Sequence, residues 1–145
     1  MSWQDLENEH PILAETGKKR LNGRVSYLAT VQGNGAPRVH PVTPIVGNGQ
    51  LFVFMEPTSP KGKDLVRGSR FALHCGVEDN SGGGGEFYVW GNGRFITDPA
   101  TRQIAIAASS YTPADRYILF ELDVDRARST TYSEDGTLHE RWQAS

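Results

Sequence analysis

The segment Gln50–Leu73, QLFVFMEPTSPKGKDLVRGSRFAL, restricts the fold more than any other part of this chain. Leu51–Met55 is an unbroken apolar run too short for a capped helix, so it predicts a strand that is covered on both faces. Ser59 is a suitable N-cap, and Pro60 suits the first helical position because it has no N–H to leave unpaired. Gly68 then limits the helix to about two turns, because glycine favours the left-handed residue that ends a helix. The segment therefore predicts a strand, a short helix and a second strand.

The first turn of this short helix carries two lysines, Lys61 and Lys63. The positive end of the helix dipole repels cations placed there, so two lysines in the first turn destabilise the helix itself. Exposed amide groups at Lys61 and Gly62, the Ser59 hydroxyl and both ammonium groups would all attract an anion there. The pattern therefore indicates a site for phosphate or carboxylate. The alternative, that both lysines are solvated surface groups, fits the sequence alone equally well.

Length and composition limit the class of protein. At 145 residues we expect one domain, residues 1–145, large enough to bury a real core. The net charge of −2 implies no general attraction to nucleic acid or to a membrane surface. No apolar stretch approaches the length of a transmembrane helix, and the polar, acidic start MSWQDLENEH is unlike a signal peptide. A single cysteine, Cys75, excludes an intramolecular disulfide, so we expect a cytoplasmic protein. Because Cys75 lies inside an apolar strand, we expect its thiol to be packed rather than reactive.

The elements before the central segment alternate between helical and strand patterns. His10–Leu21 predicts a helix, with proline at its first position and three basic residues near its end. Arg24–Gln32 alternates as a strand does, and Gly33–Gly35 is typical of a hairpin turn. Ala36–Val46 would be the partner strand. It carries three prolines, which cannot donate to a strand ladder, so we expect it to be irregular and partly unpaired.

The C-terminal half predicts mainly strands. The expected elements are a strand at Arg70–Glu78, a glycine-rich loop at Asp79–Gly85, a strand with a bulge at Glu86–Ile96, a helix from Pro99 to about Ser110 capped by Asp98, strands at Tyr117–Val124 and Ser129–Tyr132, and a turn at Asp135–Gly136. In Tyr117–Val124, alternation places Phe120 and Leu122 inward and Glu121 and Asp123 outward. Six or seven short, hairpin-linked strands with marginal helices indicate a mainly β (α+β) antiparallel barrel rather than a doubly wound sheet.

Most familiar reaction chemistry has no motif in this sequence. The four histidines have no cysteine or carboxylate at metal-ligand spacing, so no metal site is predicted. No nucleophile elbow, phosphate-binding loop or dinucleotide fingerprint is present, and paired carboxylates for acid–base catalysis are not identifiable. By elimination, the anion site beside apolar strands is the best functional signal. An anionic, partly aromatic ligand such as a flavin phosphate would suit it.

One stretch closely resembles a known family. Arg24–Cys75 contains the strand pair ATV…G.P..HPV followed by LFVF…TSPK..DL…SRFAL, and a looser likeness continues through GEFYVWGNGRF and YILFELDVDRA. These features resemble the pyridoxamine 5′-phosphate oxidase-like family of FMN-binding split β-barrels. The resemblance implies a Greek-key split barrel of six to seven strands. It also implies a homodimer that holds FMN, or in some branches the deazaflavin F420, at the subunit interface.

Carried over position by position, the resemblance implies a cofactor site. Its residues would be Val39, His40, Pro41, Val42 and Thr43 on one strand, Phe54 and Met55 on the next, the phosphate anchors Ser59 and Lys61 with Pro60 between them, Lys63 as an additional contact, and Glu86 from the partner subunit. The chain departs from the oxidases at His40 and Pro60, where they often carry arginine, and at Glu86, where they often carry glutamine. From the residues alone, Val39, Val42 and Phe54 also fit ordinary core positions, and His40 fits a hydrogen-bonded strand histidine.

The C-terminal TLHER, Thr137–Arg141, faintly resembles the stretch with which the true oxidases hold substrate phosphate, but Thr137 replaces the arginine. We therefore do not expect oxidation of pyridoxamine phosphate, and we expect Trp142 to pack against a neighbouring surface. The implied function is an FMN-dependent oxidoreductase that passes a hydride to or from a small organic substrate, with catalytic residues unknown. The alternatives are an F420-dependent reductase, a non-catalytic flavin- or haem-binding protein, or a family member that has lost its cofactor.

Dimerisation has a separate argument. On the central strand, Leu51, Val53 and Met55 point one way, and Phe52 and Phe54 point the other way. One small barrel interior can bury only one of these sets. We therefore expect the second set to be covered by a partner subunit.

Overall fold

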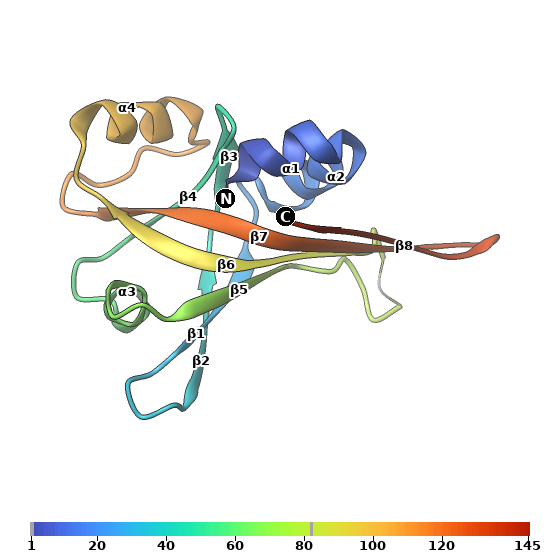
Figure 1. Ribbon diagram of the computed structural model, residues 1–145, viewed down its shortest axis with the longest axis horizontal. Coiled ribbons are helices and arrows are strands. Elements are labelled where there is room, and N and C mark those ends of the chain that lie inside the picture. The colour runs from blue at the N-terminus through green and yellow to red at the C-terminus, as the bar shows by residue number, and fades with distance from the viewer. Residues whose placement is uncertain (1, 82) are drawn as a thin grey trace.

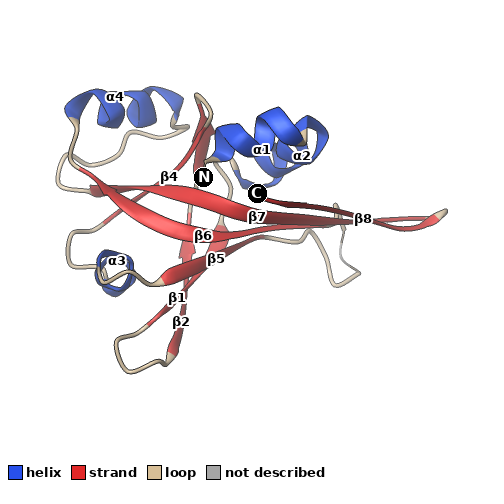
Figure 2. Cartoon of the chain, viewed as in Figure 1, coloured by secondary structure: helices blue, strands red, loops and turns tan. Residues whose placement is uncertain are grey.

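The computed structural model describes residues 2–81 and 83–145 of the chain. Figures 1 and 2 show a twisted sheet with helices around it. The elements are α1 (Trp3–Glu9), α2 (Pro11–Leu21), β1 (Ser26–Val31), β2 (Pro37–Val42), β3 (Ile45–Gly47), β4 (Gln50–Met55), α3 (Pro60–Val66), β5 (Arg70–Cys75), β6 (Glu86–Ile96), α4 (Pro99–Ala108), β7 (Ile118–Ser133) and β8 (Gly136–Gln143).

The eight strands form one antiparallel sheet in the order β2-β1-β5-β6-β7-β4-β3, with β8 paired to β7. The mainly β antiparallel class expected from the sequence is confirmed, but the strand count is higher. One cause is that the predicted strand Ala36–Val46 is two strands, β2 and β3, at opposite ends of the order. Pro44 lies between them and has no N–H, while its carbonyl accepts from the Gly23 amide at 2.9 Å. The prolines therefore divide the strand and place its two parts on different edges.

The C-terminal strands also differ from expectation. The two strands predicted at Tyr117–Val124 and Ser129–Tyr132 are one continuous strand, β7. β8 begins at Gly136, within the predicted turn at Asp135–Gly136, and no strand was predicted there. β7 and β8 make a hairpin that projects from the body (right in Figure 1). Trp142 of β8 is only 8% exposed and belongs to the main core of its own chain.

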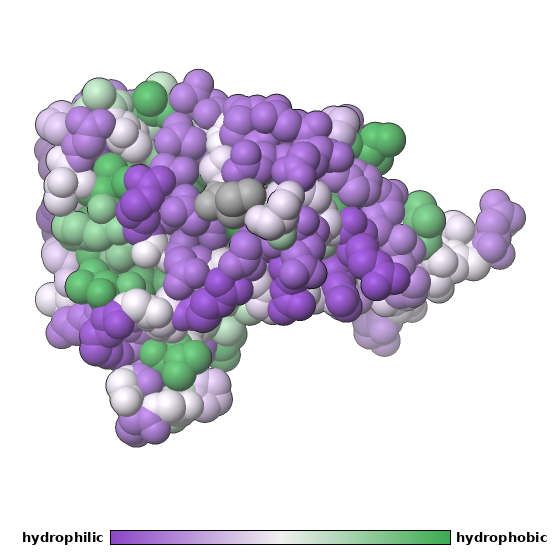
Figure 3. Space-filling view, in the orientation of Figure 1, coloured by the Kyte–Doolittle hydropathy of each residue, from purple (hydrophilic) through white to green (hydrophobic). Residues whose placement is uncertain are grey.

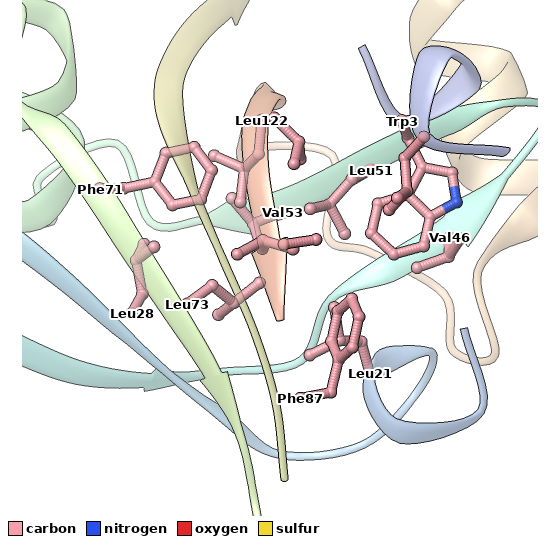
Figure 4. Close-up of a cluster of buried hydrophobic side chains, with 14 of the residues drawn as sticks. Trp3, Leu21, Leu28, Val46, Leu51, Val53, Phe71, Leu73, Phe87 and Leu122 are labelled. Atoms are coloured by element: carbon pink, nitrogen blue, oxygen red, sulfur yellow. The ribbon is translucent and has the colours of Figure 1, made fainter. Parts of the chain in front are cut away.

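The main core lies between the inner sheet face and the N-terminal helices (Figure 4). α1 was not predicted, although Ser2 and Asp5 form a capping box at its start. Its Trp3 is fully buried and meets Phe87 of β6 edge to face, with ring centroids 6.0 Å apart. Gly17 of α2 also packs directly on Phe87, so both N-terminal helices are fixed on the same ring.

A second apolar cluster lies beneath α4, on the other face of β4. It contains Phe52 and Phe54 from β4 together with Ile45, Ala105 and Leu119. The inference that the second face of β4 needs a partner subunit is therefore wrong, because α4 of the same chain covers it. Burial on this side also explains why Glu121, expected to point outward, is 4% exposed and is bonded by Gln50 and Arg94.

Figure 3 shows a largely hydrophilic surface, with apolar groups gathered at the end of the molecule that carries α3 and α4 (left in the view). Across the described ranges, no helix has both the length and the apolar character needed to cross a membrane. In the same ranges, no three histidine, cysteine or carboxylate side chains cluster as metal ligands would.

Candidate functional site

A cleft of about 530 Å³ opens where the end of β2, the start of α3 and the link from α4 to β7 meet. It is lined by His40, Pro41, Val42, Thr43, Phe54, Met55, Glu56, Thr58, Ser59, Pro60, Lys61, Tyr111 and Tyr117. Nine of the twelve residues that the family resemblance implied are in this set. The structure thus brings together side chains that are up to 21 positions apart in the predicted site (His40 to Lys61).

Lys61 is the most constrained charged residue of the cleft. It is only 7% exposed, and its Nζ donates a hydrogen bond to Ser59 Oγ at 2.8 Å. Within residues 2–81 and 83–145, no carboxylate oxygen lies within 4.0 Å of this ammonium. Burial lowers the pKa of Lys61 below its ordinary value of 10.5. Because a buried charge without a counter-charge costs free energy, the cleft has an ammonium that an anionic ligand would neutralise.

Ser59 occupies the N-cap position of α3, as predicted, but its side chain does not cap the helix. The hydroxyl instead accepts from the Lys61 ammonium, since hydrogen bonds from charged donors are the stronger ones. The amide of Gly62, expected to be available to an anion, donates to the Ser59 carbonyl at 3.1 Å. α3 has only seven residues. The anion-attracting groups are therefore the Lys61 ammonium and the Ser59 hydroxyl, rather than the end of the helix.

Three residues of the implied site lie outside the cleft. Lys63 is exposed and lines a separate hollow with Arg38 and Arg67, so the expected convergence of two ammonium groups is not found. Val39 is 66% exposed, on the opposite face of β2 from the cleft residue His40. Glu86 begins β6 and accepts hydrogen bonds from His74 Nε2 and from the Tyr132 hydroxyl, each at 3.2 Å.

The apolar floor of the cleft is held by the second core cluster. Phe54 is 8% exposed and packs beneath α4, where the Arg102 guanidinium lies 5.1 Å from its ring centroid. His40 is exposed at the rim, with Nδ1 3.3 Å from the Pro41 carbonyl. The cleft therefore has a charged pole at Lys61 and an apolar, aromatic floor. That combination suits a planar ring system that carries an oxyanion.

Sequence reasoning missed four residues of the cleft: Glu56, Thr58, Tyr111 and Tyr117. Glu56 follows the predicted site residue Met55 and Thr58 precedes the predicted anchor Ser59, so these neighbours were an available signal. Tyr111 and Tyr117 lie in the connection between α4 and β7, about 50 residues further along the chain. Only the packing of α4 over β4 brings that connection to the cleft, and no local pattern indicates it.

Asp64 fixes α3 against the sheet. It is 1% exposed and accepts from Thr30 Oγ1 at 2.7 Å, from Arg38 Nε at 2.8 Å and from Arg67. Burial would raise the pKa of this carboxyl, but the hydrogen bonds from Arg38, Thr30 and Arg67 outweigh that effect and lower it. Because Asp64 is three residues after Lys61, this network also fixes where Lys61 lies.

The fold is that of the pyridoxamine 5′-phosphate oxidase-like split barrels, and solved structures of that type are similar to this chain. A heme binding protein from Mycobacterium smegmatis has a TM-score of 0.67 at 17% identity, over 90% of this chain and 58% of that protein. A protein from Clostridium acetobutylicum, related to general stress protein 26 of Bacillus subtilis and placed in the pyridoxinephosphate oxidase family, has a TM-score of 0.61 at 13% identity over 94% of both chains.

HutZ, the heme storage protein from Vibrio cholerae, has a TM-score of 0.59 at 14% identity over 80% of this chain and 89% of its own. No protein-family model matches the sequence, and no curated protein matches it. TM-scores of 0.59–0.67 at identities of 13–17% show a shared fold and nothing more. What the chain binds therefore has to be argued from its own residues.

Proposed function

We propose that the cleft binds FMN and that the protein is a homodimeric, FMN-dependent oxidoreductase acting on a small organic substrate. The observation that carries this proposal is the buried ammonium of Lys61, whose hydrogen-bond partner is the Ser59 hydroxyl and which faces no carboxylate in the described residues. A phosphate monoester supplies both the negative charge and the acceptor oxygens that these two donors need.

The cleft fits the two chemically different parts of FMN. Lys61 and Ser59 would hold the phosphate, while Val42, Phe54 and Met55 offer apolar surface for a planar ring. Bound FMN supplies hydride transfer, which no side chain here provides. The side chains bind and orient the ligand and exclude water from one side of it. F420 would bind through the same Lys61 ammonium. Measuring the affinities for FMN and for F420 side by side shows which of the two cofactors the protein prefers.

Dimerisation is supported by the outer face of the β2-β1 edge. Tyr27, Val31 and Val39 are each 45–66% exposed there, and the register places them beside the prolines of β2. A sheet face this apolar is typical of an interface. The family resemblance independently implies a homodimer, with the partner subunit's Glu86 as a cofactor contact.

The test is a titration of the purified full chain with FMN, followed by flavin fluorescence. Lys61→Met is expected to weaken binding about tenfold or more, the range for loss of a charged hydrogen bond. Lys63→Met is the matched control, because it removes the same charge two residues away and outside the cleft. Equal effects of the two substitutions, or no FMN binding by the wild-type protein, would refute the assignment.

Haem binding is the second candidate. Two proteins of similar fold are named for it, and His40 lines the cleft with no described residue bonded to its Nε2. An imidazole nitrogen can ligate haem iron. The absorption spectrum of the protein as purified distinguishes flavin bands from a haem Soret band. Loss of a Soret band in His40→Ala, with flavin binding unchanged, would favour haem.

A further inference from the structure

One side of the cleft is formed by the connection between α4 and β7 and is called the tyrosine wall below. It contributes two aromatic side chains, Tyr111 and Tyr117, and both are half-buried. No described residue forms a hydrogen bond with either phenol hydroxyl, although phenol groups at partly buried sites usually find a partner. The wall therefore contributes two phenol hydroxyls that have no hydrogen-bond partner among the described residues.

Several contacts hold the end of the connection that leads into β7. Arg102 of α4 donates to the Tyr117 carbonyl at 2.7 Å and to the Asp115 carbonyl at 3.3 Å. Arg116 grips the Glu56 carboxylate through Nε, at 2.9 and 3.1 Å, and its guanidinium lies 5.2 Å from the Tyr117 ring centroid. These contacts connect the tyrosine wall to the opposite rim of the cleft. Preorganised groups of this kind lose little entropy when a ligand binds.

The two rings also influence each other. Tyr111 packs against the apolar cluster beneath α4, and burial together with the nearby Tyr117 raises the pKa of the Tyr111 phenol above its ordinary value. The phenol is thus neutral and protonated throughout the physiological range, so it can donate a hydrogen bond. It cannot attract a cation as a phenolate would.

We propose that Tyr111 and Tyr117 form the substrate-selecting wall of the cleft, and that they favour a planar carbonyl compound whose oxygen accepts a hydrogen bond from a phenol. This inference rests on the proposed function, because it assigns the substrate to the cleft that holds the cofactor. Lys61 and Ser59 bind the anionic part of one ligand, and the tyrosine wall binds an uncharged acceptor. The two ends of the cleft therefore recognise different chemistry.

The experiment uses two probes that differ only at one position. 4-Hydroxyacetophenone has a ketone where 4-ethylphenol has a methylene, so the ratio of their affinities measures the hydrogen bond to the carbonyl. Both are titrated calorimetrically into the full chain, with and without FMN. The wild-type protein should prefer the ketone by about fivefold, the range for one neutral hydrogen bond. The preference should fall in Tyr111→Phe and Tyr117→Phe and disappear in the double variant.

Tyr88→Phe is the matched control, because it makes the same change on β6, outside the cleft, at a tyrosine whose hydroxyl also has no hydrogen-bond partner among the described residues. The proposed role of the two tyrosines is refuted if the double variant keeps the wild-type ratio of the two affinities. It is also refuted if the wild-type protein does not prefer the ketone. FMN affinity is read in the same samples, and a loss of FMN affinity in the tyrosine variants that matches their loss of ketone preference would assign the hydroxyls to the cofactor and overturn the substrate wall. If the wild-type protein prefers the ketone but does not bind FMN, the proposed cofactor is refuted, and the recognition of a carbonyl by Tyr111 and Tyr117 is still supported.

Discussion

The ammonium of Lys61 donates to the hydroxyl of Ser59 across 2.8 Å, and this contact occupies the side chain that would otherwise cap α3. A helix start without its side-chain cap loses about 1 kcal/mol of stability. A buried ammonium that faces no carboxylate adds a further cost. The structure thus keeps two unfavourable features side by side at one end of a cleft, which is typical of residues retained for binding rather than for folding.

If Lys61 is retained for binding, Lys61→Met should stabilise the ligand-free protein, by about 1 kcal/mol, because it replaces a buried charge with an apolar chain of similar length. The same change should remove the rise in melting temperature that FMN gives the wild-type protein. Thermal unfolding with and without FMN measures both effects. A lower melting temperature of the ligand-free variant would show that the ammonium has a structural role.

Binding of FMN should weaken at alkaline pH. Burial lowers the pKa of Lys61 below 10.5, and a bound phosphate favours the charged form. Above about pH 7, where the phosphate is a dianion, affinity should stay level up to the lowered pKa of Lys61 and fall as the pH rises through that pKa, before pH 10.5 is reached. Lys61→Arg keeps its charge throughout this range, so its affinity should stay level. A decline of the same size in that variant would assign the effect to another group.

Asp64→Asn should destabilise the protein by about 3 kcal/mol at neutral pH. This is the low end for breaking a buried ion pair, since the two arginine partners reach solvent. The pKa of Asp64 is lowered from 3.8, so its stabilisation is fully present above pH 3.8 and is lost as the pH falls through the folded-state pKa. The free energies of unfolding of the two proteins, measured with denaturant, should therefore differ at pH 7, and the difference should become smaller in acid. A difference that does not change with pH would contradict this.

Gly17→Ala should destabilise the protein although alanine is the better helix former. A Cβ at Gly17 would overlap the ring of Phe87, which is fully buried and cannot move aside. Such overpacking costs about 1–3 kcal/mol, more than the gain of about 1 kcal/mol in helix propensity. Lys18→Ala, on the exposed side of α2, is the control and should change stability by less than about 0.5 kcal/mol. Chemical denaturation compares the three proteins.

The proposed dimer predicts that a charge on the outer sheet face separates the subunits. Val39→Asp should shift the molar mass found by light scattering from dimer to monomer, because a buried carboxylate in an apolar interface has no partner. Val66→Asp is the matched control: Val66 is also 66% exposed but belongs to α3. A wild-type protein that is monomeric at micromolar concentration, or an equal effect of both substitutions, would contradict the proposed interface.

Local patterns predicted the elements whose signals are contained within a few residues. The proline at the first position of α2, the glycine turns that flank β2 and β3, and the two-turn length of α3 all follow from backbone preferences near the residue concerned. β6 was predicted with its observed bounds, and its register shifts at Trp90/Gly91, beside the Gly91–Gly93 stretch where a bulge was expected. The antiparallel class follows from these hairpins.

The family resemblance also named nine residues of the cleft, which come from the end of β2 and the residues after it, from β4, and from the start of α3. It could not place Tyr111 and Tyr117, show that Lys63 leaves the cleft, or show that α4 covers Phe52 and Phe54. Each of these depends on which face of one element meets another element far along the chain. The short helix after β4, with Ser59 and Lys61 at its start, follows from residue type and backbone preference near those positions. The burial of Lys61, its bond to Ser59 and the residues that surround them come from packing between segments far apart in the chain, which the preferences of single residues do not set.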